Sequence, residues 1–249
     1  VTAARWAHEN LKLTGPLRVA DASARRRQVG HGAVIACGSS ERQLPSDKSV
    51  DLVLTDPPYF DDVQYAELAS LFLATARAVE LVPRSVSLDL GSEAVGNHAR
   101  GAGVNEYRSL LAKIFAEAQR TLKPGGRVVL TYHNTDIRAW WALAEALAEA
   151  KLEIRALAVA HAENGSDHAK RGSNAFTSDL VIECRRAVRA PVAVVSVGEP
   201  LSSEACELFA AGRAMAACPT DLKQFITVYL RERGDAAGAR IHVPTPEAS

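Results

Sequence analysis

The sequence predicts an α/β fold built on a doubly wound, mostly parallel sheet with an antiparallel strand at its edge. Short apolar runs alternate with segments of helical periodicity, an order that is typical of parallel sheets covered by helices. The chain has 249 residues, which suits one core with an appendage. Its composition is 47% hydrophobic and 23% charged, as in ordinary globular proteins, and this excludes disorder of the whole chain.

Two apolar runs predict the first strands. Residues 33–37 (AVIAC) lead into Gly-Ser-Ser, and residues 50–55 (VDLVLT) lead into Asp-Pro-Pro, so each strand ends at a loop. Apolar residues then recur at helical spacing from 65 to 79. Residues 80–103 are rich in Gly and Ser and predict an irregular connection.

The clearest helical pattern of the chain follows at residues 104–122, and the Gly-Gly of Lys-Pro-Gly-Gly ends it. The next elements are expected in the order strand, helix, strand, loop and strand, at residues 127–132, 137–148, 151–161, 162–177 and 179–184. Because no helix joins the last two strands, we expect them to form an antiparallel hairpin at the sheet edge.

The composition along the chain predicts three parts. Residues 1–30 form a basic N-terminal segment, which is either a solvated stretch or a surface that contacts phosphate. Residues 31–189 hold the α/β domain, and residues 190–249 form a C-terminal extension with further helical spacing, for packing or interaction. The chain begins with Val rather than Met, so we expect it to be part of a longer chain.

Overall charge and cysteine usage exclude several classes of protein. Lys+Arg and Asp+Glu are 29 each, so nucleic-acid contact would have to come from local patches rather than bulk charge. No apolar run approaches the ~20 residues of a membrane helix, and the first residues lack a secretory signal. The cysteines form no C-x-x-C pair, so we expect neither structural zinc nor disulfides, and a reduced, cytoplasmic setting. His161 and His168 lack a third spaced ligand, and no metal site is predicted.

The segment that carries chemistry is Thr-Asp-Pro-Pro-Tyr-Phe at residues 55–60. In an open α/β sheet, ligands bind beyond the carboxyl ends of the strands, where this segment is expected. Two prolines make the loop stiff. Asp56 and the carbonyl of Pro57 can accept hydrogen bonds from the two N–H groups of an aromatic amine, while Tyr59 stacks on the ring that carries the amine. A plain rigid turn is the alternative, which the adjacent aromatic residue and the apolar strand before the loop make less favoured.

The D-P-P-Y segment resembles the motif of S-adenosylmethionine-dependent amino-methyltransferases that act on nucleic acid bases. The stretches YFDDVQYAEL and TYHNTD extend this resemblance to the adenine-specific DNA methylases whose longer members carry a zinc ribbon. The resemblance covers roughly residues 33–186 and implies a Rossmann-like methyltransferase sheet, S-adenosyl-L-methionine as cofactor and DNA as partner.

The resemblance also implies roles for individual residues. Asp56, Pro57, Pro58 and Tyr59 would form the catalytic loop, and Asp56 would share cofactor binding with Cys37, Gly38 and Ser39. The residues expected to contact the substrate are Phe60, Tyr132, His133, Lys170 and Arg171, of which the last two would meet DNA phosphate.

Two features depart from this family. The chain has no Gly-rich turn of the D-P-F-x-G-x-G kind, and it has no zinc ribbon. We therefore expect the first strand to be missing and an upstream segment of the same protein to carry the Gly-rich turn. Three functions stay open: adenine methylation in DNA, amino-methylation of RNA or of cytosine, and a non-catalytic fragment. A glutamine-directed enzyme is less favoured, because such relatives have Asn at the position of Asp56.

Overall fold

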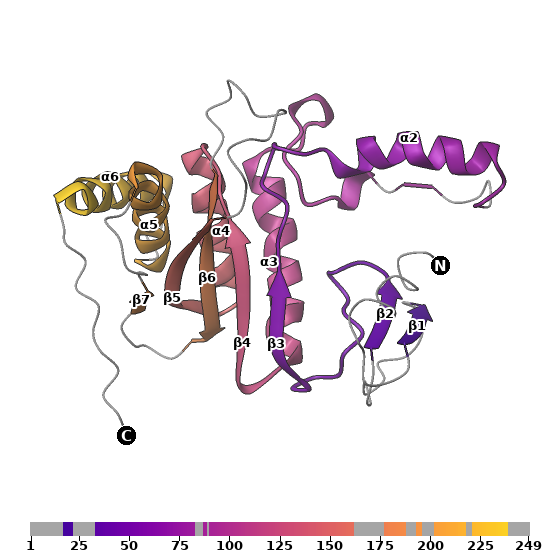
Figure 1. Cartoon of the computed structure of the whole chain (residues 1–249), viewed down its shortest axis with the longest axis horizontal. Helices are drawn as coiled ribbons and strands as arrows, with labels where there is room; N and C mark the ends of the chain where they lie inside the picture. The colour runs from indigo at the N-terminus through magenta and orange to yellow at the C-terminus, as the bar shows by residue number, and fades with distance from the viewer. Residues whose placement is uncertain are drawn as a thin grey trace.

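A five-stranded mixed sheet forms the centre of the fold (Figure 1). The computed structural model describes residues 17–21, 33–82, 87–88, 90–161, 177–187, 193–195, 202–217 and 221–238. The strands follow the order β3-β4-β6-β5-β7, with bounds β3 (Val50–Thr55), β4 (Leu122–Tyr132), β5 (Leu152–His161), β6 (Ser178–Arg186) and β7 (Ala193–Val195). β3 is parallel to β4 and β5 is parallel to β7, so the α/β class with parallel pairing is confirmed.

The antiparallel strand lies inside the sheet, and its predicted place at the edge is wrong. β6 forms the expected antiparallel hairpin with β5, and it also pairs antiparallel with β4 from Arg127↔Arg185 to Tyr132↔Leu180. β6 therefore lies between β4 and β5, while β7 adds the outer strand. The sequence indicates a hairpin from its loop, but it carries no signal for the side of β5 on which the returning strand pairs.

A second, two-stranded parallel sheet joins β1 (Leu17–Asp21) to β2 (Ala33–Cys37). β2 has the predicted bounds, whereas β1 lies within the predicted basic segment and was not expected as a strand. The loop after β2 is fixed to α3 (Val104–Thr121), where the Arg120 guanidinium donates to the carboxylates of Glu117 and Asp47. The end of β2 is thus held beside α3, outside the five-stranded sheet.

Helices cover one face of the large sheet. Residues of alternating position in β4 and β6 are buried, among them Leu130 and Ile182, which lie opposite each other in the ladder. The helices that pack on this face are α3, α4 (Ile137–Glu149) and α5 (Ser203–Ala216). A Cβ on Gly212 of α5 would come within 3.0 Å of Leu157 and Leu180, so the helix approaches the sheet closely. β7 and α5 show that the predicted C-terminal extension packs directly on the sheet.

The opposite face is open among the described residues. Leu52 and Leu54 of β3 are 48% and 73% exposed. The doubly wound arrangement, with helices on both faces, is therefore not what the described part of the chain displays. α6 (Leu222–Gly238) lies beside α5, and α2 (Tyr65–Ala78) extends away from the sheet with no buried residue (Figure 1). No helix of the described residues has the length and apolar character needed to cross a membrane.

Candidate functional site

The D-P-P-Y loop begins where β3 ends, at the same end of the sheet as the carboxyl end of β4. β3 and β4 are parallel, and Thr55 lies opposite Leu130 in the ladder. Thr131 is the next residue of β4, and it faces the open side of the sheet because neighbouring side chains of a strand alternate. This pairing brings Thr131 next to Asp56, the first residue after β3.

Two hydroxyl groups hold the Asp56 carboxylate. Oγ1 of Thr131 donates to Oδ1 of Asp56 over 2.7 Å, and the Tyr59 hydroxyl donates to the same oxygen over 2.5 Å. Oδ2 of Asp56 accepts no hydrogen bond from the described residues. Burial, and then the hydrogen bond to Asp56, raises the pKa of Tyr59 far above the ordinary tyrosine value, so this hydroxyl stays protonated. The carboxylate is therefore fixed through one oxygen, and the other is available.

The carbonyl groups of the loop are held one after another. The Pro58 carbonyl accepts a hydrogen bond from the Tyr107 hydroxyl at 2.7 Å, and the Tyr59 carbonyl accepts one from Nδ2 of Asn134 at 2.9 Å. The Phe60 carbonyl accepts from the backbone N–H of Gly96 at 3.0 Å. Pro57 is buried, and its carbonyl accepts no hydrogen bond from the described residues. Because a backbone carbonyl can accept hydrogen bonds, the Pro57 carbonyl beside Asp56 is, among the described residues, an acceptor without a donor.

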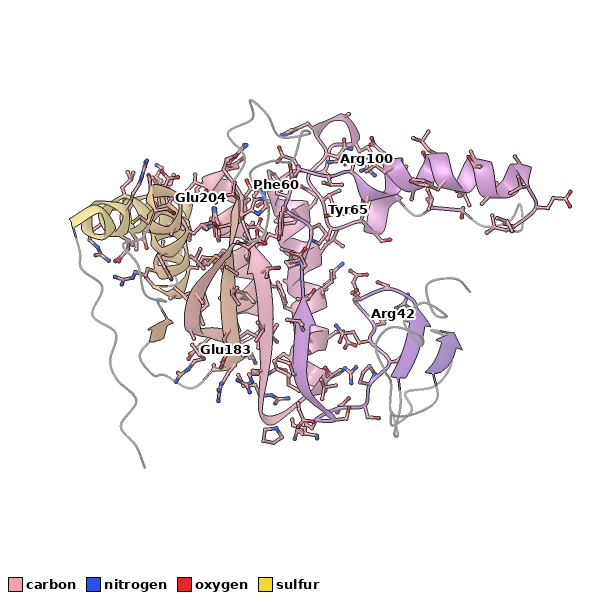
Figure 2. All side chains as sticks on the ribbon, in the orientation of Figure 1. Arg42, Phe60, Tyr65, Arg100, Glu183 and Glu204 are labelled. Atoms are coloured by element: carbon pink, nitrogen blue, oxygen red, sulfur yellow. The ribbon has the colours of Figure 1, made fainter. Side chains whose placement is uncertain are left out.

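Phe60 and Tyr132 belong to the core, which differs from their expected contact with the substrate. Phe60 is 1% exposed, its ring centroid lies 5.2 Å from that of Tyr107, and a Cβ on Gly96 would meet its ring at 2.5 Å. Figure 2 shows Phe60 above the carboxyl ends of β3 and β4. Tyr132 is fully buried, because strand alternation turns it toward the helices and leaves Thr131 on the open face. Both rings are therefore part of the core that supports the loop.

Tyr59 and His133 lie together beside the carboxylate. Tyr59 is half-buried, and its ring centroid lies 4.5 Å from that of His133 with an interplanar angle of 61°. Nδ1 of His133 lies 2.5 Å from Oδ1 of Asp179, at the start of β6. The structure thus brings together three of the predicted site residues, Asp56, Tyr59 and His133.

Sequence reasoning missed three residues of the site, namely Thr131, Tyr107 and Asp179. Strand alternation beside Tyr132 could have indicated Thr131. An antiparallel β6 could have indicated Asp179, because such a strand starts where its neighbour ends. No sequence signal links Tyr107 to the loop, since that contact spans 49 positions.

The predicted cofactor residues at the end of β2 are not joined to the site around Asp56. Gly38 and Ser39 are exposed at the end of β2, and Oγ of Ser39 accepts from the backbone N–H of Glu41. β2 pairs with β1 and is not part of the sheet that carries Asp56. The described residues therefore do not form a common pocket that would fit S-adenosylmethionine. Lys170, Arg171 and the side chain of Cys37 lie outside the described residues.

A cavity of about 150 Å³ lies between the start of α4 and the two C-terminal helices, lined by Asn134, Trp140, Glu207 and Tyr229 among others. Sites for drug-sized ligands usually measure ~300–1,000 Å³, so this cavity is too small for a nucleoside cofactor. Nowhere in the described part of the chain do three or more His, Cys, Asp or Glu side chains gather in a group that could hold a metal ion.

No protein-family model and no curated protein matches the chain. Among solved structures, it is similar to TTHA0409 from Thermus thermophilus, which is provisionally named a DNA modification methylase. One crystal structure of TTHA0409 has 14% identity and a TM-score of 0.35, covering 70% of this chain and 72% of that one. Its selenomethionine derivative (80% and 75% covered) and its complex with S-adenosyl-L-methionine (70% and 73%) have 14% identity and TM-scores of 0.33. Likeness at this level assigns neither a family nor an activity to the chain.

Proposed function

We propose that this protein methylates the exocyclic amine of adenine in DNA, with S-adenosylmethionine as methyl donor. The observation that supports this proposal is a pair of acceptors, Oδ2 of Asp56 and the carbonyl of Pro57, which lie beside the half-buried ring of Tyr59 and accept no hydrogen bond within the described part of the chain. An amine has two N–H donors, and two fixed acceptors match them. An aromatic ring beside them suits a planar heterocycle.

The chain's own residues would act by positioning. Two hydrogen bonds to the amine would turn the nitrogen lone pair away from the ring and toward an electrophile. Asp56 is held by Thr131 and Tyr59, so its carboxylate needs no rearrangement to stabilise the positive charge that develops on nitrogen. Tyr59 would stack on a base flipped out of the duplex, which is worth ~1–3 kcal/mol per base. Lys170 and Arg171 are proposed contacts to phosphate.

The methyl group would come from the cofactor. The proposed binding site of the cofactor consists of the end of β2 together with Asp56. Among the described residues, these parts lie in different sheets and do not meet. We propose that an upstream segment with a Gly-rich turn completes the site. The exposed Leu52 and Leu54 on β3 support this idea, because an added layer would cover them. RNA or cytosine is an alternative substrate, because it offers the same kind of amine. The separation of β2 from Asp56 favours a further alternative, a fragment that does not catalyse methyl transfer.

The proposal is tested by Asp56→Ala in the complete protein, with tritiated S-adenosylmethionine and adenine-containing DNA. Losing one preorganised polar contact should lower the rate of methyl transfer by ~100–1,000-fold. The fold should remain, since Asp56 is exposed, and circular dichroism checks this. Asp62→Ala is the matched control, because Asp62 is an exposed acid of the same loop. Turnover by Asp56→Ala at the rate of the unmodified protein would rule out this loop as the catalytic one.

A further inference from the structure

The pair Asp179 and His133 lies at the rim of the candidate site. β6 runs antiparallel to β4, and Tyr132 lies opposite Leu180, so the first residues of β6 reach the carboxyl end of β4. The two side chains are 15% and 18% exposed, and their atoms Oδ1 and Nδ1 are 2.5 Å apart. An ionised carboxylate can only accept hydrogen bonds, so Nδ1 of His133 donates. Asp179 therefore fixes both the orientation of the imidazole and the position of one of its protons.

Three donors around the Tyr59 ring point at carboxylates. The Tyr59 hydroxyl and Oγ1 of Thr131 donate to Oδ1 of Asp56, and Nδ1–H of His133 donates to Asp179. The acceptors Oδ2 of Asp56 and the Pro57 carbonyl receive no hydrogen bond from the residues that the structure describes. These two acceptors can bind a group that donates hydrogen bonds, such as –NH₂. A carbonyl oxygen in the same place would find no partner among the three donors, because each already donates to a carboxylate. Unpaired polar groups in a partly buried site are costly.

We infer that Asp179 is a specificity-determining residue: by holding the Nδ1 proton of His133, it selects a base with an exocyclic amine over one with a carbonyl in the same place. The inference rests on the proposed function, since a base is taken to lie on Tyr59. Asp179 touches the substrate only through His133 and is a positioning residue. Its charge also acts on the neighbouring ring, because Asp179 is among the groups that raise the pKa of Tyr59.

Removing Asp179 has a defined consequence for His133. Without the carboxylate, the imidazole loses the acceptor that holds its Nδ1 proton. It can then turn an N–H toward a carbonyl oxygen, and the preference for an amine falls. Asparagine keeps an acceptor oxygen at this position without the charge, so its effect should be intermediate.

The test compares the full chain with its variants in binding an oligothymidylate that carries one adenine or one hypoxanthine, which has a carbonyl in place of the amine. Dissociation constants come from fluorescence anisotropy. The unmodified protein should prefer adenine by at least about tenfold. Asp179→Leu should reduce this preference to about threefold or less, and Asp179→Asn should fall between. Glu183→Leu and Glu183→Gln are the matched controls, because Glu183 is an acid on the same face of β6. Figure 2 shows Glu183 near the opposite end of the sheet from Phe60.

A second measurement covers variants that fold poorly. Nitrogen-15 NMR of the histidine rings should find His133 in the Nδ1–H tautomer in the unmodified protein and in the Glu183 variants, and should find that tautomer lost in Asp179→Leu. An unchanged adenine preference in a folded Asp179→Leu, or no preference in the unmodified protein, would overturn the inference. Adenine preference that depends on Asp179 in a protein without methyl transfer would uphold it and would instead count against the proposed function.

Discussion

The hydroxyl of Tyr59 donates to Oδ1 of Asp56 over 2.5 Å, which joins the aromatic ring and the carboxylate of the candidate loop. Thr131 donates to the same oxygen from the neighbouring strand. A carboxylate held by two donors loses rotational freedom, and its second oxygen then points in one direction. Tyr59 thus has two tasks, of which the sequence suggests only stacking.

Tyr59→Ala should weaken capture of a flipped base more strongly than Tyr59→Phe. Stacking needs the ring, so its removal should cost ~1–3 kcal/mol of base binding. Phenylalanine keeps the ring and loses one of the two donors to Asp56, so its effect should be smaller and should be seen mainly in the rate. Binding is measured with an oligonucleotide that contains 2-aminopurine, whose fluorescence reports stacking. Equal damage to binding from both substitutions would contradict the stacking role.

Tyr107→Phe should destabilise the protein although it keeps the buried ring. The Tyr107 hydroxyl donates to the Pro58 carbonyl and contacts the Tyr132 hydroxyl. Leaving buried polar groups without a partner costs ~1–3 kcal/mol. Urea unfolding measures the change, and Tyr229→Phe on α6 is the control, because that ring is only partly buried. A Tyr107→Phe protein as stable as the control would mean that the loop is held without this hydroxyl.

The free energy of unfolding should fall at high pH because of Tyr107 and Tyr132. Burial raises the pKa of Tyr107 and Tyr132 well above the ordinary value of ~10. Above that value the unfolded chain releases these protons while the folded protein keeps them, so the free energy of unfolding is steady up to about pH 10 and declines above it, by up to ~1.4 kcal/mol per pH unit for each group. Urea unfolding from pH 8 to 11 tests this, and the decline should be shallower in Tyr107→Phe. Parallel curves for both proteins would show that Tyr107 ionises normally.

Much of the fold could be predicted from local pattern. The strands at 33–37 and 50–55 have the predicted bounds, since apolar runs ended by turn residues are a local signal. The place of β6 inside the sheet depends on pairing between distant residues such as Leu130 and Ile182, which no local pattern encodes. The open face beside Leu54 is equally hidden, because a parallel-sheet strand reads as apolar whether or not helices cover it.

The site was predictable where its residues lie in one motif, or where a residue such as His133 directly follows a predicted strand. Asp56 and Tyr59 lie in one short motif, so their proximity could be foreseen. Asn134, which donates to the Tyr59 carbonyl, comes from 75 positions away. Phe60 was expected at the substrate because it follows the motif, yet its backbone has a φ of +58°, and the chain turns its ring into the core.

The last prediction concerns the cofactor. The 249-residue chain should bind S-adenosylmethionine weakly, because the charged methionine end of such a ligand is usually held by backbone N–H groups of a Gly-rich turn at a helix start, and the sequence has no such turn. The end of β2 at Gly38 belongs to a different sheet from Asp56, so each can offer only part of a pocket. Missing contacts of ~3–4 kcal/mol would weaken binding by more than a hundredfold. Isothermal titration of the purified chain measures this, with Gly38→Val as the control for binding at the end of β2. Micromolar affinity in the unmodified chain, lost in Gly38→Val, would show that the end of β2 holds the cofactor without a Gly-rich turn, and an upstream segment would then not be needed.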